Sequence, residues 1–195
     1  MKQDLFNYYK NALSDGLCAE YKGRWAACHN DKEQLVRLVM AQQSLPHFIT
    51  YCSQKKGLSK KYILDNFSDY INGKYVGVDV DGVRGNYKTE LYVGENGILK
   101  PVGDVLCTMW ATTPQIILPR YKAVKIYCGC SSKIHLSCDG YNSLVLMLFD
   151  DSEIVIDDAD GDTMILAYKY SPQAKVTIGD YCFAPVKEFT KELKL

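Results

Sequence analysis

The chain has 195 residues, and its apolar fraction of 47% and charged fraction of 24% are typical of a globular protein with a real core. Lys plus Arg and Asp plus Glu both number 23, so the formal net charge is zero, which excludes the strongly basic surface of a direct nucleic-acid binder. No apolar run is long enough to span a membrane, and the first ten residues lack the apolar segment of a signal peptide.

The eight cysteines could form disulfides in a secreted protein. Because no signal peptide is recognised, we place the chain in the reducing cytoplasm and expect free thiols, most of them packed as small apolar side chains. A mature chain that has lost its signal peptide is the alternative.

Residues 1–73 are predicted to be a helical N-terminal region. Asp31 and Ser59 are placed to cap helices, and Pro46 suits the first turn of another helix. Gly73 closes the region. Residues 74–110 carry short β-branched and aromatic runs between turn residues, and we interpret them as an irregular β connection.

Residues 111–195 are predicted to be a repetitive β region, because two series of apolar pairs alternate along them. The first series has steps of 18, 20 and 22 residues: Ile116/Leu118, Ile134/Leu136, Ile154/Ile156 and Val176/Ile178. The second has three steps of 20 residues: Val124/Ile126, Leu144/Leu146, Met164/Leu166 and Ala184/Val186. A period near 20 with two short strands predicts a stacked array, in which each rung completes the core of its neighbour.

The predicted fold class is therefore α+β, with N-terminal helices followed by a β-solenoid of about 20 residues per rung. We expect two columns of buried, stacked side chains: Ile134, Ile154 and Val176, and Ile126, Leu146 and Leu166. An antiparallel sandwich or meander is the alternative, because Asp139-Gly140 and Asp160-Gly161 are hairpin signals. The linkers, at about seven residues, are longer than favoured hairpin loops, which favours the solenoid.

Side chains that alternate with these inward residues are expected to point outward. Around the second series they form an apolar patch, for which the candidate interface residues are Val145, Met147, Phe149, Ile165 and Ala167. Large exposed apolar patches mark interfaces. The patch is therefore either covered by the N-terminal helices or used for a partner protein or a second copy of the chain.

Acidic residues are concentrated between Asp139 and Asp162, where eight acids occur without any Lys or Arg. Those expected on one rung and its two corners, crowding one edge of the body, are Asp150, Asp151, Glu153, Asp157, Asp158, Asp160 and Asp162. They are the candidate partner-binding residues, since such an edge would dock a basic partner. Solvated corners that improve solubility are the alternative.

Two groups of residues have the composition of metal sites. Cys128, Cys130, His135 and Cys138 are zinc-ligand types, but their spacing is not that of a zinc site. The run from Asp158 to Asp162 resembles the start of a calcium loop whose bidentate Glu is missing. We predict no metal and no cofactor.

No catalytic motif is recognised either. Cys28 and His29 could form a nucleophile and its base, but neighbours in a chain seldom point at each other. The phosphate-binding loop, the dinucleotide-binding glycine pattern and the His-Glu-x-x-His motif are all missing from the sequence. The sequence predicts a protein that is not an enzyme.

The segment His47–Cys52, followed by Leu58–Phe67, resembles helix pairs in small accessory proteins of phages and mobile elements of gut bacteria, in which the pair ends just before a β region. The resemblance covers about a third of the chain and carries no catalytic residues. It implies an accessory protein that acts by binding a host or partner protein.

Three hypotheses for function remain: a binding protein, an acidic nucleic-acid mimic that occupies a basic groove on a host protein, and a small-ligand binder or enzyme with a pocket between helices and β region. A contiguous acidic stripe would favour the mimic. A concave pocket with convergent polar groups would favour the ligand binder. A protein partner or homo-oligomer is expected, with no direct contact to nucleic acid or membrane.

Overall fold

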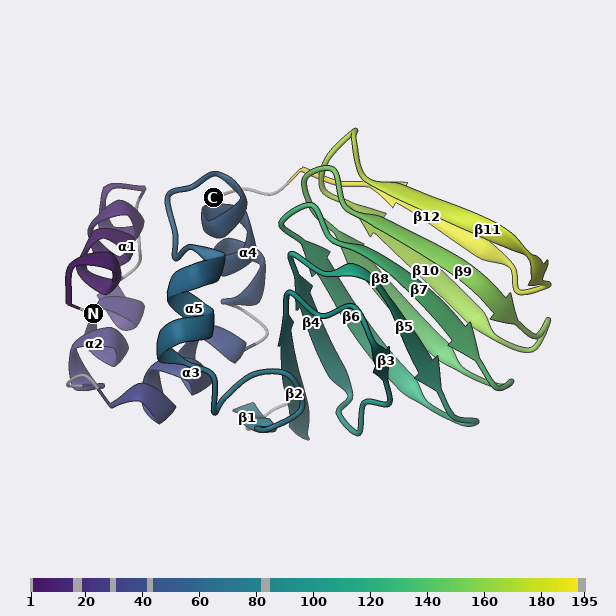
Figure 1. Cartoon of the computed structure of the whole chain (residues 1–195), viewed down its shortest axis with the longest axis horizontal. Coiled ribbons are helices and arrows are strands. Elements are labelled where there is room, and N and C mark those ends of the chain that lie inside the picture. Colours follow the sequence, from purple (N-terminus) through teal and green to yellow (C-terminus); the bar gives the residue numbers. More distant parts are fainter. Residues whose placement is uncertain (1, 16–18, 29–30, 42–43, 82–84, 193–195) are drawn as a thin grey trace.

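The computed structural model describes residues 2–15, 19–28, 31–41, 44–81 and 85–192, and it has the predicted α+β architecture (Figure 1). Helices come first within these residues: α1 (Lys2–Ser14), α2 (Ala19–Ala27), α3 (Lys32–Met40), α4 (Leu45–Ser53) and α5 (Lys60–Asn66). Strands follow: β1 (Gly77–Asp81), β2 (Gly85–Val93), β3 (Ile98–Leu99), β4 (Val105–Met109), β5 (Thr112–Leu118), β6 (Ala123–Gly129), β7 (Lys133–Cys138), β8 (Ser143–Leu148), β9 (Glu153–Ala159), β10 (Met164–Lys169), β11 (Lys175–Cys182) and β12 (Val186–Thr190).

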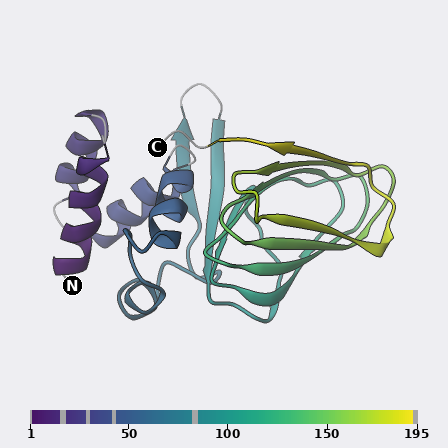
Figure 2. The ribbon, with the colours of Figure 1, turned by 90° about the horizontal axis from the view of Figure 1, so that it is seen from above.

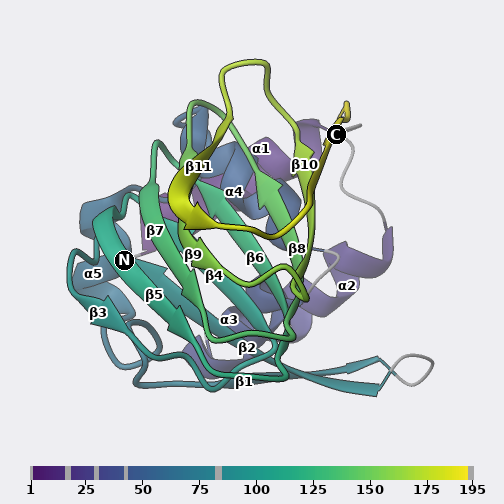
Figure 3. The same ribbon diagram turned by 90° about the vertical axis from the view of Figure 1, so that its right-hand side faces the viewer.

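The strands form two sheets that the chain visits alternately. The long sheet has the order β1-β2-β4-β6-β8-β10-β12, and the short sheet has the order β11-β9-β7-β5-β3. The β1–β2 pair is antiparallel, and the other described pairs are parallel. This is a β-solenoid of about five turns, which confirms the predicted repeat and makes the antiparallel alternative wrong. Figure 3, in which the last rung faces the viewer, shows the rungs stacked one behind another.

The solenoid begins before the repeat that is visible in the sequence. β2 pairs with β4 and β4 pairs with β6, all parallel and without a register shift. Residues 85–109 thus build the first rungs, rather than an irregular connection. The β1–β2 hairpin extends beyond the body of the solenoid (Figures 2 and 3).

Equivalent side chains of successive rungs stack in columns inside the solenoid. Ile134, Ile154 and Val176 share one column, as predicted. Ile134 and Ile154 are fully buried, whereas Val176 lies in the last rung and is only half-buried. Ile116 stacks on Leu136 and not on Ile134, because β5 and β7 pair at an offset of 20 residues after a register shift early in β5.

A second bulge lies in β9. Ile156 pairs with Leu136, and the next pair joins Asp158 to Ser137. Asp157 is therefore an extra residue, which makes this rung one residue longer than the predicted period. Because strand side chains alternate, one inserted residue reverses the faces of everything that follows.

The reversal changes the second predicted column. Ile126 and Leu146 stack as expected, but the next member of the column is Ala167. Ala167 and Ile165 are fully buried, and Leu166 points outward beside Val145. The predicted burial of Leu166 is thus wrong, because Asp157 had shifted the alternation.

The corners of the rungs use left-handed backbone conformations at several residues other than glycine. Trp110, Cys130 and Asp150 lie at φ of 51°, 56° and 45° where strands of the long sheet end. Tyr121 and Tyr141 lie at 60° and 51° on the opposite side of the solenoid. Such angles let the chain turn sharply between the two sheets, at a cost in local backbone strain.

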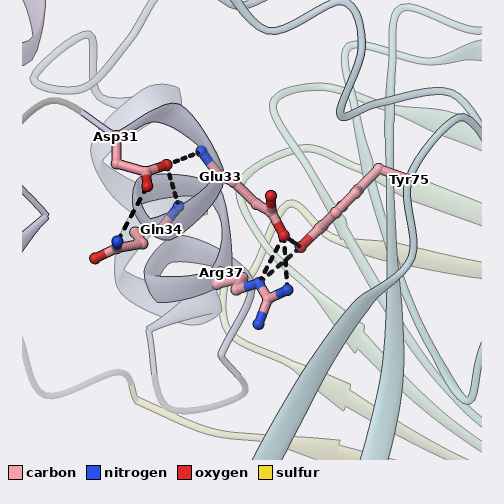
Figure 4. Close-up of polar contacts among 5 residues, drawn as sticks. All are labelled: Asp31, Glu33, Gln34, Arg37 and Tyr75. Carbon is pink, nitrogen blue, oxygen red and sulfur yellow. Dashed lines mark hydrogen bonds and ion pairs between the residues drawn. The ribbon is translucent and has the colours of Figure 1, made fainter.

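The helices begin where their capping residues predict. The Asp31 carboxylate accepts hydrogen bonds from the backbone N–H groups of Glu33 and Gln34, and α3 starts after it (Figure 4). One turn later, Arg37 bridges Glu33 and the hydroxyl of Tyr75, with N–O distances of 2.6 and 3.0 Å. This contact ties α3 to the segment that leads into β1.

Two apolar cores result. One fills the solenoid between its two sheets. The other lies between the helices and the outer face of the long sheet, and it includes Met40, Phe48 and Ile49 from the helices and Cys107 and Tyr127 from the sheet. The helices are therefore a cover for one face of the solenoid, beside its first strands (Figure 1).

A buried carboxylate in β2, that of Glu90, stabilises the first rung of the solenoid, which we call its base, through hydrogen bonds. Glu90 is 2% exposed and accepts backbone hydrogen bonds from Val102 at 2.8 Å and Gly103 at 2.5 Å. The Tyr92 hydroxyl donates to its other oxygen. Burial and the neighbouring Glu90 raise the pKa of Tyr92, so this hydroxyl remains a donor at neutral pH.

The last rung is more polar than those before it. Lys169 occupies the same column as the buried Leu148, and Glu188 occupies the column of Ala167. Both charged side chains therefore point toward the interior, where they form an ion pair with an N–O distance of 2.7 Å.

Candidate binding face on the outer side of the long sheet

The outer face of the long sheet carries mostly apolar side chains, but the helices cover only its first strands. One column shows this: Cys107, Tyr127, Met147, Tyr168 and Phe189, from successive strands β4 to β12. Exposure is 0% at Cys107 and 2% at Tyr127. Met147 and Tyr168 are half-buried, and Phe189 is 43% exposed. Exposure rises because α3 and α5 lie against β2 and α4 lies against β6.

We call the uncovered part the open face. It consists of the outward side chains of β8, β10 and β12: Ser143, Val145, Met147, Met164, Leu166, Tyr168, Lys187 and Phe189. Met164 is 51% exposed. Of the described residues that point outward from these three strands, Lys187 alone is charged. The open face is thus an apolar surface bordered by a cation.

Stacked aromatic rings run along this side of the solenoid. Tyr127, Phe149 and Tyr170 form one stack, with centroid distances of 6.4 and 4.9 Å. Tyr168 and Phe189 form a second stack, with a centroid distance of 5.2 Å. Stacking restricts ring orientation, so a partner that binds Tyr168 or Phe189 would immobilise rings that are already partly ordered.

A groove of about 710 Å³ lies between one flank of α4 and the last rungs of the solenoid, at the side of the open face. Its lining is mixed: Thr50, Ser53, Gln54, Phe149, Asp150, Tyr170, Ser171, Pro172, Thr190, Lys191 and Glu192. Part of the polar lining is already used. Asp150 accepts hydrogen bonds from the hydroxyls of Ser53 and Ser152, each at 2.6 Å, and from the backbone N–H of Ser131. Asp150 thus ties a corner of the solenoid to α4.

Part of the predicted apolar patch points outward, and its role as an interface stays a prediction. Val145 and Met147 lie on the open face. Phe149 also points outward, but it is 3% exposed and belongs to the core beneath the helices. The outward positions predicted for Ile165 and Ala167 are wrong. Both side chains are fully buried inside the solenoid, because the bulge in β9 reverses the alternation of the side chains that follow it.

The residues missed by the sequence prediction are Met164, Leu166, Tyr168 and Phe189. A signal for two of them was present. Large side chains recur in Tyr127, Met147, Tyr168 and Phe189 at steps of 20, 21 and 21 residues, so the change of step could have located the inserted residue.

The acidic residues do not crowd one edge. Asp150 and Asp151 precede β9, and Asp158, Asp160 and Asp162 lie at or beyond its far end. The seven residues of β9 span roughly 23 Å at 3.3 Å per residue, so the two groups occupy opposite corners. The expectation of a single acidic edge is wrong, and no contiguous stripe favours the nucleic-acid mimic.

The two acids between these corners already have partners on the outer face of the short sheet. Glu153 lies 3.1 Å from the Lys133 ammonium and accepts a hydrogen bond from Thr177 at 2.8 Å. The Thr177 hydrogen bond, with help from Lys133, lowers the pKa of Glu153. Asp157 lies 3.0 Å from Nδ1 of His135. This face is a polar network, unlike the open face.

The cysteines and histidine with zinc-ligand chemistry do not converge. Cys128 and Cys138 are buried inside the solenoid, whereas His135 points outward. Burial raises the pKa of the Cys128 and Cys138 thiols to about 12, so they stay protonated at neutral pH. Within the described residues, no group of three or more His, Cys, Asp or Glu side chains could hold a metal ion, and this includes Asp158 to Asp162. His29 lies outside the described residues.

Comparison with known protein families, with curated proteins and with solved structures finds no match for the chain. The helices that the structure describes are too short or too polar to cross a membrane. Function must therefore be argued from the surface itself.

Proposed function

We propose that the protein is a non-enzymatic binding protein that holds a partner protein on the open face. The observation that carries the proposal is the exposure gradient along the outer face of the long sheet. The same kind of apolar column is covered by helices at Cys107 and Tyr127 and left uncovered at Tyr168 and Phe189. An apolar surface that continues past its own cover is typical of an interface.

The opposite side of the solenoid supports this choice. The outer face of the short sheet is equally uncovered, but it carries the ion pairs of Lys133 with Glu153 and of His135 with Asp157. This solvated sheet face thus carries paired polar side chains, and the mostly apolar open face needs another explanation. The free thiols of the described cysteines fit a reducing cytoplasm. Action on a host protein, as an accessory protein of a mobile element, is part of the same proposal.

Photo-crosslinking tests the proposal. A benzophenone amino acid in place of Met164 should give a discrete adduct in the native cell, because Met164 is exposed on the open face. The same group in place of Thr177, exposed on the short sheet, should give none. Leu166→Glu should remove the Met164 adduct, and the matched change Ile117→Glu, half-buried on the outer face of the short sheet, should leave it intact.

Failure to obtain an adduct at Met164, or an adduct that survives Leu166→Glu, would remove the open face as the binding site. An adduct with twice the mass of the chain would identify the partner as a second copy. Circular dichroism of each variant shows that the fold is retained.

A small ligand in the groove beside α4 is the second candidate, because a concave space with polar groups lies between helices and solenoid. It ranks lower, since Asp150 is already bound by Ser53, Ser131 and Ser152. Gln54→Trp would fill the groove without touching the open face. If that variant abolishes a function that Leu166→Glu preserves, the groove is the site.

A further inference from the structure

We propose that the partner's binding element is an amphipathic α-helix with acidic flanks, laid on the open face beside α4. This inference rests on the function proposed above and names the chemistry of the partner. It is argued from what covers the first half of the same sheet, from the width of the second half, and from the charges around it.

Helices are the established cover of this sheet face. Phe48, Ile49 and Cys52 of α4 are buried in the core beneath the helices, where α4 contacts β6, and α3 and α5 pack against β2. The open face continues the same columns of side chains with the same strand direction. The first strands of this surface already pack against helices. The following strands present similar rows of side chains, against which another helix could pack.

The width of the open face suits one helix. Neighbouring strands lie ~4.8 Å apart, so the three strands β8, β10 and β12 present a face about 10–14 Å wide. Packed helices lie about 8–10 Å from one another, which equals the width of two strands. A helix centred over β10 would therefore contact both β8 and β12. It would also reach the groove, whose other wall is the flank of α4 with Thr50, Ser53 and Gln54.

The charges around the open face are mostly positive. Lys187 is exposed and points outward from β12, and Lys125 points outward from β6 beside Val145. The ammonium of Lys191 lies 4.2 Å from the centre of the Tyr168 ring, which holds it above the face. Glu188, the acid of β12, points inward and is paired with Lys169.

Two acids line the groove. Asp150 already accepts hydrogen bonds from Ser53, Ser131 and Ser152, and Glu192 lies beyond Lys191. Acidic side chains on a docked helix would thus meet Lys187 and Lys191 at the rim of the apolar contact. Rim charges add specificity and association rate more than affinity. The apolar stripe of the helix would cover Met147, Leu166 and Tyr168.

Selection from a displayed library tests the inference with the purified full chain. The library holds helix-forming peptides with fixed apolar residues at i, i+3, i+4 and i+7, and with flanks that vary between Glu, Lys, Gln and Ser. We expect selected peptides to carry Glu on the flanks. Their affinity should fall about tenfold for the K187E/K191E variant. The matched variant K100E/K175E changes exposed lysines elsewhere and should bind as the parent does.

Three results would overturn the inference: selection of no helical peptide, selection of neutral or basic flanks, or unchanged affinity in K187E/K191E. Sedimentation of the free protein as a dimer that Leu166→Glu dissociates would also overturn it, since a second copy would then occupy the face. These failures are distinguishable from failure of the proposed function. A Met164 adduct that forms with an extended segment would retain the binding face and reject only the helix.

Discussion

Ile49 of α4 fills the space above Gly129 of β6 where a side chain would otherwise be. A β-carbon on Gly129 would lie 2.1 Å from the Cγ2 atom of Ile49. The absence of a side chain at one residue therefore lets α4 lie directly on the sheet. Gly129→Ala should force the two apart and destabilise the protein by about 1–3 kcal/mol, measured by urea unfolding.

Two comparisons check the cause. Gly97→Ala is the control, because a β-carbon there would meet nothing within 4 Å, and it should be nearly neutral. Ile49→Ala together with Gly129→Ala should cost less than the sum of the two single changes, since alanine at 49 removes the clashing atom. Additive costs would show that Ile49 and Gly129 do not interact in this way.

The bulge at Asp157 leads to a prediction about two adjacent residues of β10, Ile165 and Leu166. Ile165 is fully buried, and Leu166 is half-buried on the open face. Ile165→Ala should therefore lower the free energy of unfolding by about 2–5 kcal/mol, and Leu166→Ala by less than about 1 kcal/mol. Equal losses, measured by urea unfolding, would contradict the inward position of Ile165 and the outward position of Leu166.

The carboxylate at the base of the solenoid makes a third prediction. Glu90→Leu would leave the backbone donor of Gly103 and the Tyr92 hydroxyl buried without an acceptor, and would also unpair the partly buried donor of Val102, at a cost of about 3 kcal/mol or more. Tyr92→Phe removes only one of these donors and should cost less. Thermal melting of both variants gives the comparison, and a larger loss for Tyr92→Phe would argue against the central role of Glu90.

A fourth prediction concerns pH. Burial in α4 lowers the pKa of His47 below its ordinary value of 6.5. The folded state therefore binds fewer protons than the unfolded state as pH falls below about 6.5, and stability decreases until the lowered pKa is reached. His47→Gln should reduce the change in urea midpoint between about pH 7.5 and about pH 5. An unchanged difference would mean that His47 is not desolvated.

The repeat could be predicted because a solenoid needs apolar side chains at every rung, which leaves pairs such as Ile134/Leu136 and Ile154/Ile156 at a regular spacing. The bulge at Asp157 could not be foreseen from the pairs alone. Asp and Gly are common at corners, so one more Asp at a strand end changes the pattern little. The register predicted for β10 is therefore wrong by one residue.

The position of the helices on the sheet could not be predicted from the sequence either. β4 is buried on both sides, and β8 is covered on one side only, yet both are mostly apolar on both faces. A sequence of this kind shows that both faces are apolar, and it is the same whether a helix or a solvent-exposed interface lies above it. The candidate patch at Val145 and Met147 was therefore predictable, but its exposure was not.

The inward ion pair of Lys169 and Glu188 is expected to limit fibre growth from this protein. Stacked parallel strands are the geometry of amyloid, and a bare edge strand invites another chain to extend the stack. A strand added to β12 would cover this pair and remove two charges from water, which costs several kcal/mol per ion before their attraction is counted. The polar interior of the last rung thus opposes templated addition on the β12 edge, so the same repeat that builds the fold need not propagate between molecules.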